Sequence, residues 1–168
     1  MRRPDAGTVW LFDLDNTLHD AGAWVVGELH AAMDDYVAGA LNLSAAEARR
    51  LSVHYWRRYG ATLLGLMRHH GVRPAHFLAQ THRLPGLEAQ VRGHAHDNAA
   101  LARLAGRKLI LTNAPRDYAL RVLGALGIAR LFDGVIAIDD MMMFGHLRPK
   151  PDSRMLRWVA ARLGVRPG

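Results

Sequence analysis

The sequence predicts an α/β protein in which a parallel-sheet core is interrupted by a helical insert. Short apolar runs rich in β-prone residues occur at 8–12, 108–112 and 134–138. Helical patterns lie between the second and third runs and after the third, which is typical of a parallel sheet with right-handed crossovers. Between the first and second runs, from about Gly22 to Gly93, the periodicity is helical and no strand is predicted.

The first strand is predicted at Val9–Phe12 and is followed directly by two carboxylates, Asp13 and Asp15. Where such a strand ends, the chain enters the crevice in which open α/β sheets bind ligands. Two carboxylates that lie close together repel each other and need a cation or a shared proton, and a hard divalent metal meets that need. The alternative is that these aspartates only cap a turn.

The insert is predicted to contain four helices. Its apolar residues recur at intervals of three to four, beginning with Trp24, Val25 and Leu29. The expected stop and start signals are, in order, Gly39 and Asn42, the capping box Ser44–Glu47, Gly60, Gly71 and Pro74.

After Gly93 the α/β pattern resumes, with helices expected at 98–104, 115–126 and 152–163. The second strand ends in Thr112 and Asn113, and Lys150 stands between two prolines. Taken singly, Thr-Asn after a strand is often only a helix start, and a lysine between prolines is usually a solvated loop residue.

Together these residues allow phosphoryl transfer. A carboxylate attacks an anionic phosphate ester only if the charge is neutralised, which Mg²⁺ and a positive side chain can do. Asp13 is the candidate nucleophile, and Asp15 is the candidate general acid and then general base. Thr112 and Asn113 can donate hydrogen bonds to the phosphoryl group, and Lys150 can supply positive charge.

The same stretches resemble the signatures of the haloacid dehalogenase-like hydrolase superfamily. Asp13-Leu14-Asp15-Asn16-Thr17 resembles its first signature, DxDxT, Leu109–Asn113 its second and Pro149–Pro151 its third, in the same order. The resemblance implies a Rossmann-like core made of residues 1–20 and 94–168, with a helical cap domain at 21–93. It also implies that the Asp13 side chain and the Asp15 carbonyl bind Mg²⁺, and that Thr17 belongs to the phosphate-binding loop.

The second aspartate bears on the reaction class. Family dehalogenases lack this general acid, so Asp15 favours a phosphatase. The runs 12–19 and 112–123 resemble the pyrimidine 5′-nucleotidase branch, which implies a nucleoside 5′-monophosphate such as UMP or CMP as the substrate. No residue of the insert can be named as the base reader: Trp24, Tyr55 and Trp56 could stack on a base, but aromatic residues at helical spacing are more often core.

Two other functions stay open at this point. One is a phosphatase for another small metabolite, such as phosphoglycolate. The other is a non-catalytic remnant of the fold. The resemblance includes a fourth signature, one or two acids after a later strand beside the first, and no acid follows Asp152. We therefore expect a clipped or truncated chain with β-strands missing from the core, the alternative being a partner that supplies the missing strand. We also expect an exposed edge at Val9–Phe12, and little phosphatase activity from these 168 residues but activity from a longer form.

The composition limits the class of protein, its location and its partners. Half of the residues are hydrophobic, 22% are charged and none is cysteine, which indicates a globular protein without disulfides. No apolar run approaches the roughly 20 residues of a membrane helix, and no signal peptide is visible, so we expect a cytoplasmic protein without a membrane partner. The net charge of +7 comes from scattered arginines rather than one basic block, which argues against nucleic acid as a partner. The oligomeric state is not predicted.

Four further groups of residues are expected to have structural roles rather than to bind a metal or a substrate. His69-His70 and the pair His94 and His96 have no third metal ligand at a sensible spacing, so we expect surface histidines. Asp139-Asp140 is expected to cap a turn, and Met141–Phe144 is expected to be packed apolar filler.

Overall fold

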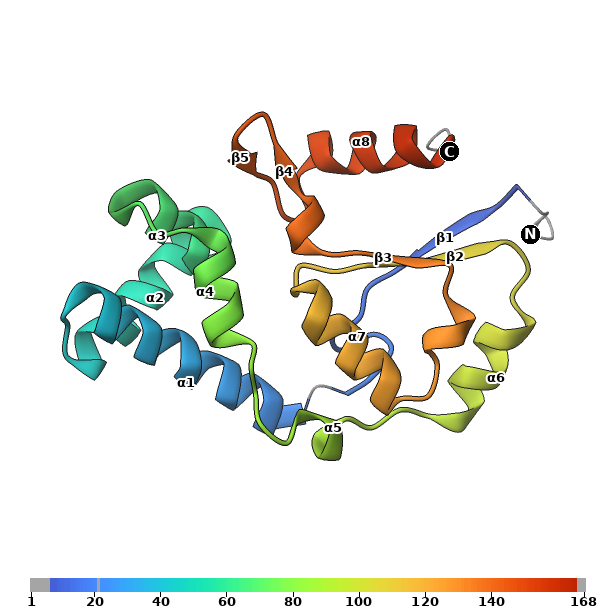
Figure 1. The fold of residues 1–168 in the computed structure, drawn as a ribbon, viewed down its shortest axis with the longest axis horizontal. Helices are drawn as coiled ribbons and strands as arrows, with labels where there is room; N and C mark the ends of the chain where they lie inside the picture. Colours follow the sequence, from blue (N-terminus) through green and yellow to red (C-terminus); the bar gives the residue numbers. More distant parts are fainter. Residues whose placement is uncertain (1–6, 21, 166–168) are drawn as a thin grey trace. The chain divides into compact units, whose positions relative to one another are not determined.

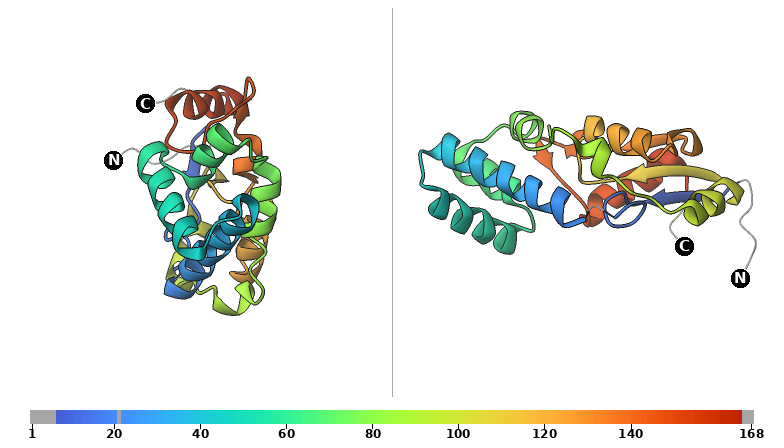
Figure 2. Two further views of the ribbon diagram at one scale, coloured as in Figure 1. Left: turned by 90° about the vertical axis from the view of Figure 1, so that its left-hand side faces the viewer. Right: turned by 90° about the horizontal axis from the view of Figure 1, so that it is seen from below.

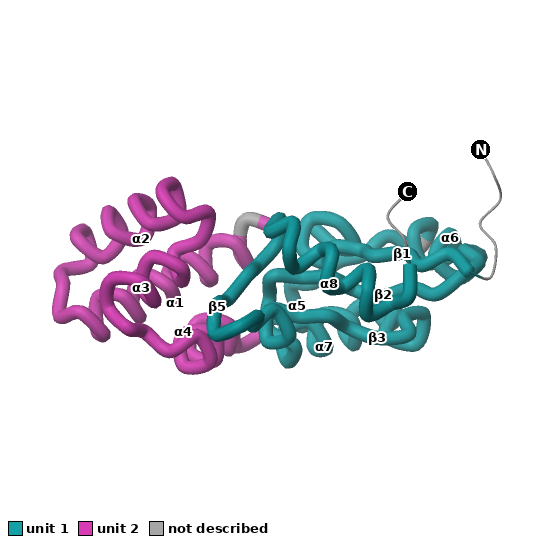
Figure 3. Tube along the Cα trace, turned by 90° about the horizontal axis from the view of Figure 1, so that it is seen from above, with its two compact units in different colours: residues 1–21, 87–168 teal, residues 22–86 magenta. Residues whose placement is uncertain are grey.

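The computed structural model describes residues 7–20 and 22–165, and its contacts divide the chain into two compact units (Figures 1 and 3). Unit 1 consists of residues 1–21 and 87–168, and unit 2 consists of residues 22–86. Unit 1 contains a parallel sheet, whereas unit 2 is helical. The chain thus has a mixed α/β fold with a parallel three-stranded sheet.

The sheet of unit 1 has the order β1-β2-β3, and both of its pairings are parallel. Its strands are β1 (Val9–Phe12), β2 (Arg107–Leu111) and β3 (Gly134–Ile136). Phe12 pairs with Ile110, and Leu111 pairs with Ile136. Because parallel strands end at the same edge of a sheet, this register brings the residues after β1 and β2 to one edge.

Helices cover both faces of this sheet. Figures 1 and 2 show α8 on one face and α7 on the other. The helices of unit 1 are α5 (Leu87–Gln90), α6 (Ala95–Arg103), α7 (Arg116–Ala125) and α8 (Ser153–Leu163). Short 3-10 turns at Ala129–Leu131 and Ile138–Asp140 and a small hairpin, β4 (Met142–Met143) with β5 (His146–Leu147), complete the unit.

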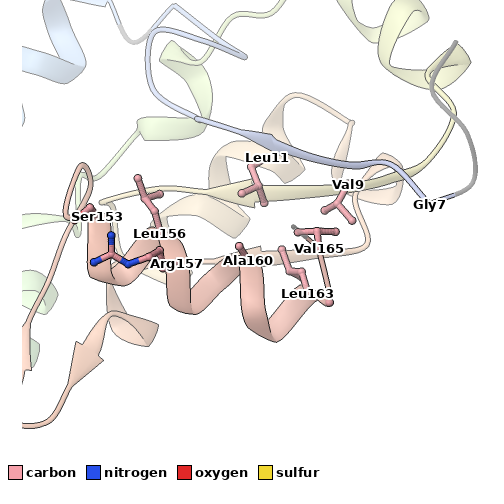
Figure 4. Close-up of a pocket in the computed structure, with 10 residues that line it drawn as sticks. Gly7, Val9, Leu11, Ser153, Leu156, Arg157, Ala160, Leu163 and Val165 are labelled. Carbon is pink, nitrogen blue, oxygen red and sulfur yellow. The ribbon is translucent and has the colours of Figure 1, made fainter. Parts of the chain in front are cut away.

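A groove of about 780 Å³ lies between β1 and α8. Figure 4 shows Val9 and Leu11 of β1 on one side of it and Leu156 and Leu163 of α8 on the other. Leu11 is 42% exposed. Among the described residues β1 pairs with β2 alone, so β1 is an edge strand, as expected from the sequence.

Unit 2 contains α1 (Gly22–Leu41), α2 (Ala45–Tyr59), α3 (Thr62–His70) and α4 (Pro74–Thr81). The predicted capping box at Ser44 and Glu47 is present, and Gly60 and Gly71 end α2 and α3 in the left-handed conformation. The prediction that Gly39 breaks the first helix was wrong. α1 continues to Leu41 and ends beside Asn42, whose φ is +52°, because one glycine only weakens a helix whereas a left-handed residue ends it.

The helical unit ends at Gly86, whereas the sequence predicted its boundary at residue 93. Leu87 and Val91 are buried, and Glu88 forms an ion pair of 2.6 Å with Arg121 of α7. These contacts place the short helix α5, which the sequence did not predict, in unit 1.

Two elements of unit 1 have bounds that differ from the prediction by at least two residues, and one segment differs in its burial. α6 begins at Ala95 rather than Asn98. β3 ends at Ile136, since Ile138–Asp140 forms a 3-10 turn rather than the end of a strand. Met141 is buried as expected, but Met142 and Phe144 are exposed because the chain turns back there in the hairpin. None of the helices in the described part of the chain is long and apolar enough to cross a membrane.

Candidate active site

The loop after β1 is built around one buried residue, Leu14. Its side chain is fully buried, and its carbonyl accepts hydrogen bonds from the backbone N–H groups of Thr17 and Leu18. Asn16 turns the loop with a φ of +55°, a conformation that asparagine tolerates better than most residues. With Leu14 held inward, Asp13 and Asp15 flank it at the carboxyl end of the sheet, and the Asp13 side chain is half exposed.

Lys150 meets Asp13 directly. Its Nζ lies 2.6 Å from Oδ1 of Asp13, and the same oxygen accepts a hydrogen bond of 2.8 Å from the backbone N–H of Leu14. The lysine side chain is 20% exposed, so water screens this ion pair only in part. The first and third predicted signatures thus meet at a single carboxylate.

Asn113 holds the backbone of Lys150 in place. Its Nδ2 donates to the carbonyl of Lys150 at 3.0 Å, and its Oδ1 accepts from the N–H of Lys150 at 2.8 Å. This pair of amide hydrogen bonds links the end of β2 to the loop that carries the lysine. Both polar atoms of the Asn113 side chain thus position Lys150, and the second N–H of Nδ2 is not used in these two bonds.

Thr112 and Thr17 have different environments. Thr112 is buried at the end of β2, and its Oγ1 accepts a hydrogen bond of 3.0 Å from the N–H of Ala114. Its hydroxyl proton therefore stays available for a second partner. Thr17 is exposed in the loop after Asp15.

Asp15 is held by two residues to which the sequence reasoning gave no role, His19 and Tyr118. His19 Nε2 lies 3.0 Å from Oδ1 of Asp15, and the hydroxyl of Tyr118 donates to the same oxygen at 2.8 Å. Burial and the adjacent carboxylate of Asp15 raise the pKa of Tyr118, so its hydroxyl stays protonated and acts as a donor. His19 and Tyr118 lie in the runs 12–19 and 112–123 described above. A histidine four residues after an aspartate, or a tyrosine in the first turn of a helix, is too common in sequences to indicate such a role.

The second acidic pair has a structural role, as expected. Asp139 accepts a hydrogen bond from the N–H of Arg116 at the start of α7. Asp140 accepts from the N–H of Ala137 and from the guanidinium of Arg116. These carboxylates hold the loop after β3 against the N-terminus of α7.

The donors around Asp13 suit a hard cation such as Mg²⁺. Oδ2 of Asp13 makes no hydrogen bond with any described residue, so it keeps the lone pairs that a metal requires. Mg²⁺ in enzymes commonly uses one or two carboxylates, several waters and substrate phosphate oxygens. In the described ranges, no three His, Cys, Asp or Glu side chains converge on a common point. The described residues would therefore contribute only part of a magnesium shell.

The histidine pairs do not form a metal centre among the residues that the structure describes. His69 and His70 lie 2.6 Å and 2.8 Å from the hydroxyls of Tyr59 and Tyr55. The rings of His94 and His96 stack on each other with centroids 5.4 Å apart. Of the aromatic residues of the insert considered for base stacking, Tyr55 is buried whereas Trp24 and Trp56 are exposed.

Comparisons with known proteins identify the family and the fold. The model of the haloacid dehalogenase-like hydrolase family matches residues 9–168. Phosphate metabolism protein 8 of Saccharomyces cerevisiae is 28% identical over 96% of this chain and 54% of its own length. The chain thus spans about half the length of this curated relative.

Two solved structures show the same fold. A HAD phosphatase from Thermococcus onnurineus matches with a TM-score of 0.54 and 22% identity, over 95% of this chain and 73% of its own. L-2-haloacid dehalogenase from Xanthobacter autotrophicus matches with a TM-score of 0.51 and 19% identity, over 95% and 66%. Because the family model covers nearly the whole sequence, this chain belongs to the haloacid dehalogenase-like hydrolases.

Proposed function

We propose that the protein is a Mg²⁺-dependent phosphomonoesterase that works through an aspartyl-phosphate on Asp13. The observation that carries this proposal is the contact of 2.6 Å between Lys150 Nζ and Asp13 Oδ1. A lysine in this place offsets the negative charge that gathers when a carboxylate attacks a phosphate ester. Membership in a hydrolase family and the presence of Asp15, which dehalogenases of the family lack, support a phosphatase.

The proposed reaction has two steps. In the first, a carboxylate oxygen of Asp13 bonds to phosphorus while the bond from phosphorus to the ester oxygen breaks, and a proton from Asp15 moves to that leaving oxygen. In the second, a water oxygen bonds to phosphorus while the bond to Asp13 breaks, and a proton of that water returns to Asp15. The products are the alcohol and inorganic phosphate.

Other side chains hold the phosphoryl group during both steps. Lys150 keeps its positive charge beside the attacked centre, and Asn113 fixes the backbone of Lys150. The hydroxyls of Thr112 and Thr17 are assigned to phosphoryl oxygens. A bound Mg²⁺, held by Asp13 and Asp15, would supply further neutralisation of the phosphate charge.

The proposed substrate is a pyrimidine nucleoside 5′-monophosphate. The resemblance of residues 12–19 and 112–123 to the nucleotidase branch supports this class. The name of the yeast relative, a phosphate metabolism protein, fits a phosphorylated small molecule without selecting one.

Phosphate release from a panel of esters tests the proposal. The purified protein is assayed with UMP, CMP and phosphoglycolate, each with Mg²⁺ and with a chelator, beside the variant Asp13→Asn. We expect slow, Mg²⁺-dependent release from the nucleotides, and none from the Asp13→Asn variant. Release from phosphoglycolate alone would overturn the nucleotide assignment but keep the phosphatase. Release that Asp13→Asn retains would overturn the mechanism.

A further inference from the structure

The hydrogen bonds around Asp15 are asymmetric. His19 Nε2 and the Tyr118 hydroxyl both address Oδ1, at 3.0 Å and 2.8 Å. Oδ2 makes no hydrogen bond with any described residue, and the Asp15 side chain is 34% exposed. Two donors therefore occupy one oxygen of the carboxylate, and the other oxygen remains available to a substrate or a water.

The contact with Asp15 indicates which ring nitrogen of His19 carries a proton. A carboxylate oxygen only accepts hydrogen bonds, so Nε2 carries the proton in this contact. The side chain is completely buried, and Nδ1 has no hydrogen-bond partner among the described residues. Leaving a buried polar atom unpaired costs free energy, and such atoms in native structures call for an explanation. The contact of Nε2 with Asp15 explains why the His19 ring is buried here although its Nδ1 is unpaired.

Tyr118 connects two parts of the site. It is buried in the first turn of α7, which begins at Arg116, three residues after Asn113. Its hydroxyl reaches Asp15 in the loop after β1. The segment that positions Lys150 through Asn113 therefore also positions Asp15 through Tyr118.

We propose that Tyr118 and His19 are positioning residues that hold Asp15 by Oδ1, so that Oδ2 is the oxygen that transfers the proton. This inference rests on the proposed phosphatase function and adds to it the residues that orient the acid. The proton on Oδ2 passes to the ester oxygen as the phosphorus bond to that oxygen breaks, and a proton of the attacking water later returns to Oδ2. A misplacement of about 1 Å at such a group can cost roughly a hundredfold in rate.

The kinetic test compares two esters with different needs for an acid. An alkyl phosphate has a poor leaving group that must be protonated, whereas p-nitrophenyl phosphate has a good one. The ratio of their kcat/KM values reports steps up to departure of the leaving group. The variants are Tyr118→Phe, which removes only the hydroxyl, His19→Leu, which removes the donor, and His19→Gln, which restores an N–H donor.

We expect Tyr118→Phe and His19→Leu to lower kcat/KM for the alkyl ester about ten- to a hundredfold more than for p-nitrophenyl phosphate. His19→Gln should recover part of that loss. The control Tyr36→Phe removes a hydroxyl that lies 2.8 Å from His76 in unit 2 and should leave the ratio unchanged. An equal loss for both esters, or no loss, would overturn the inference.

A second readout does not depend on turnover. The ¹³C resonance of the Asp15 carboxyl, assigned with Asp15→Asn, should move in Tyr118→Phe and His19→Leu and return partly in His19→Gln. Resonances that do not move would overturn the inference even in an active enzyme. If the unaltered protein hydrolyses neither ester, the proposed function and the proton-transfer role fail, while the resonance still reports whether both residues hold Asp15.

Discussion

Lys150 Nζ and Asp13 Oδ1 lie 2.6 Å apart, although most of the chain separates these residues in sequence. The proposed role of this lysine is to offset charge on the phosphoryl group, so its loss should affect the rate more than the fold. We predict that Lys150→Met lowers kcat/KM about 10²- to 10³-fold, the usual cost of removing one electrostatic stabiliser. Steady-state assays measure this effect. The control is Lys108→Met at the opposite end of β2, which should keep nearly full activity, and a similar loss in both variants would contradict the assignment.

The metal site should be weak. The described residues bring Asp13 and Asp15 to the loop but no third acidic or histidine ligand. We predict that Mg²⁺ binds the free protein poorly and more tightly when beryllofluoride occupies the phosphoryl position, because phosphate-like oxygens complete the shell. Isothermal titration with Mg²⁺, with and without beryllofluoride, tests this, and tight binding in both cases would contradict it.

The ion pair between Glu88 and Arg121 holds α5 against α7, and acid should weaken this ion pair. The hydrogen bond from Arg121 is the main reason that the pKa of Glu88 falls from 4.5 to about 2. Because the unfolded state binds the proton more readily, this contribution to stability is present above pH 4.5 and is lost as the pH falls toward about 2. The thermal midpoint of the unaltered protein should therefore drop more over that range than that of Glu88→Gln.

The effect at Glu88 is modest because the pair is partly exposed, and added salt should reduce it. Glu28→Gln on α1 serves as the matched control and should follow the unaltered protein. Parallel pH curves for Glu88→Gln and the unaltered protein would show that the ion pair contributes nothing.

Two glycines of unit 2 should respond in opposite ways to alanine. A Cβ at Gly65 would lie 2.2 Å from the ring of Tyr55, whereas a Cβ at Gly39 would meet nothing within 4 Å. We predict that Gly65→Ala destabilises the protein by about 1–3 kcal/mol through overpacking. Gly39→Ala should stabilise it by about 0.5–1 kcal/mol, since α1 runs through this position. Chemical denaturation measures both, and a neutral Gly65→Ala would show that the Tyr55 ring moves aside.

Much of this arrangement could be predicted from the sequence because the relevant signals are local. Apolar runs that end in Asp13 and Thr112 predicted the ends of two strands, and the pairing of Phe12 with Ile110 brings both ends to one edge. The capping box at Ser44 and the glycines after α2 and α3 set the helix limits for the same reason.

What could not be predicted depends on contacts distant in sequence. The pairing of Glu88 with Arg121 placed α5 in unit 1, and no local pattern contains that information. The convergence of His19 and Tyr118 on Asp15 likewise exists only after α7 has packed against the sheet. Nor did the sequence indicate that Asn113 bonds the backbone of Lys150 through both of its polar side-chain atoms.

Trapping the aspartyl-phosphate tests the central claim most directly, because it requires only one turnover. The protein is mixed with Mg²⁺ and UMP, quenched with acid and reduced with borohydride, which converts a phosphorylated aspartate to homoserine. We predict that peptide mass spectrometry finds homoserine at position 13 and at no other aspartate, and finds none in Asp13→Asn. Phosphate release without modification of Asp13, or homoserine at another aspartate, would contradict the mechanism.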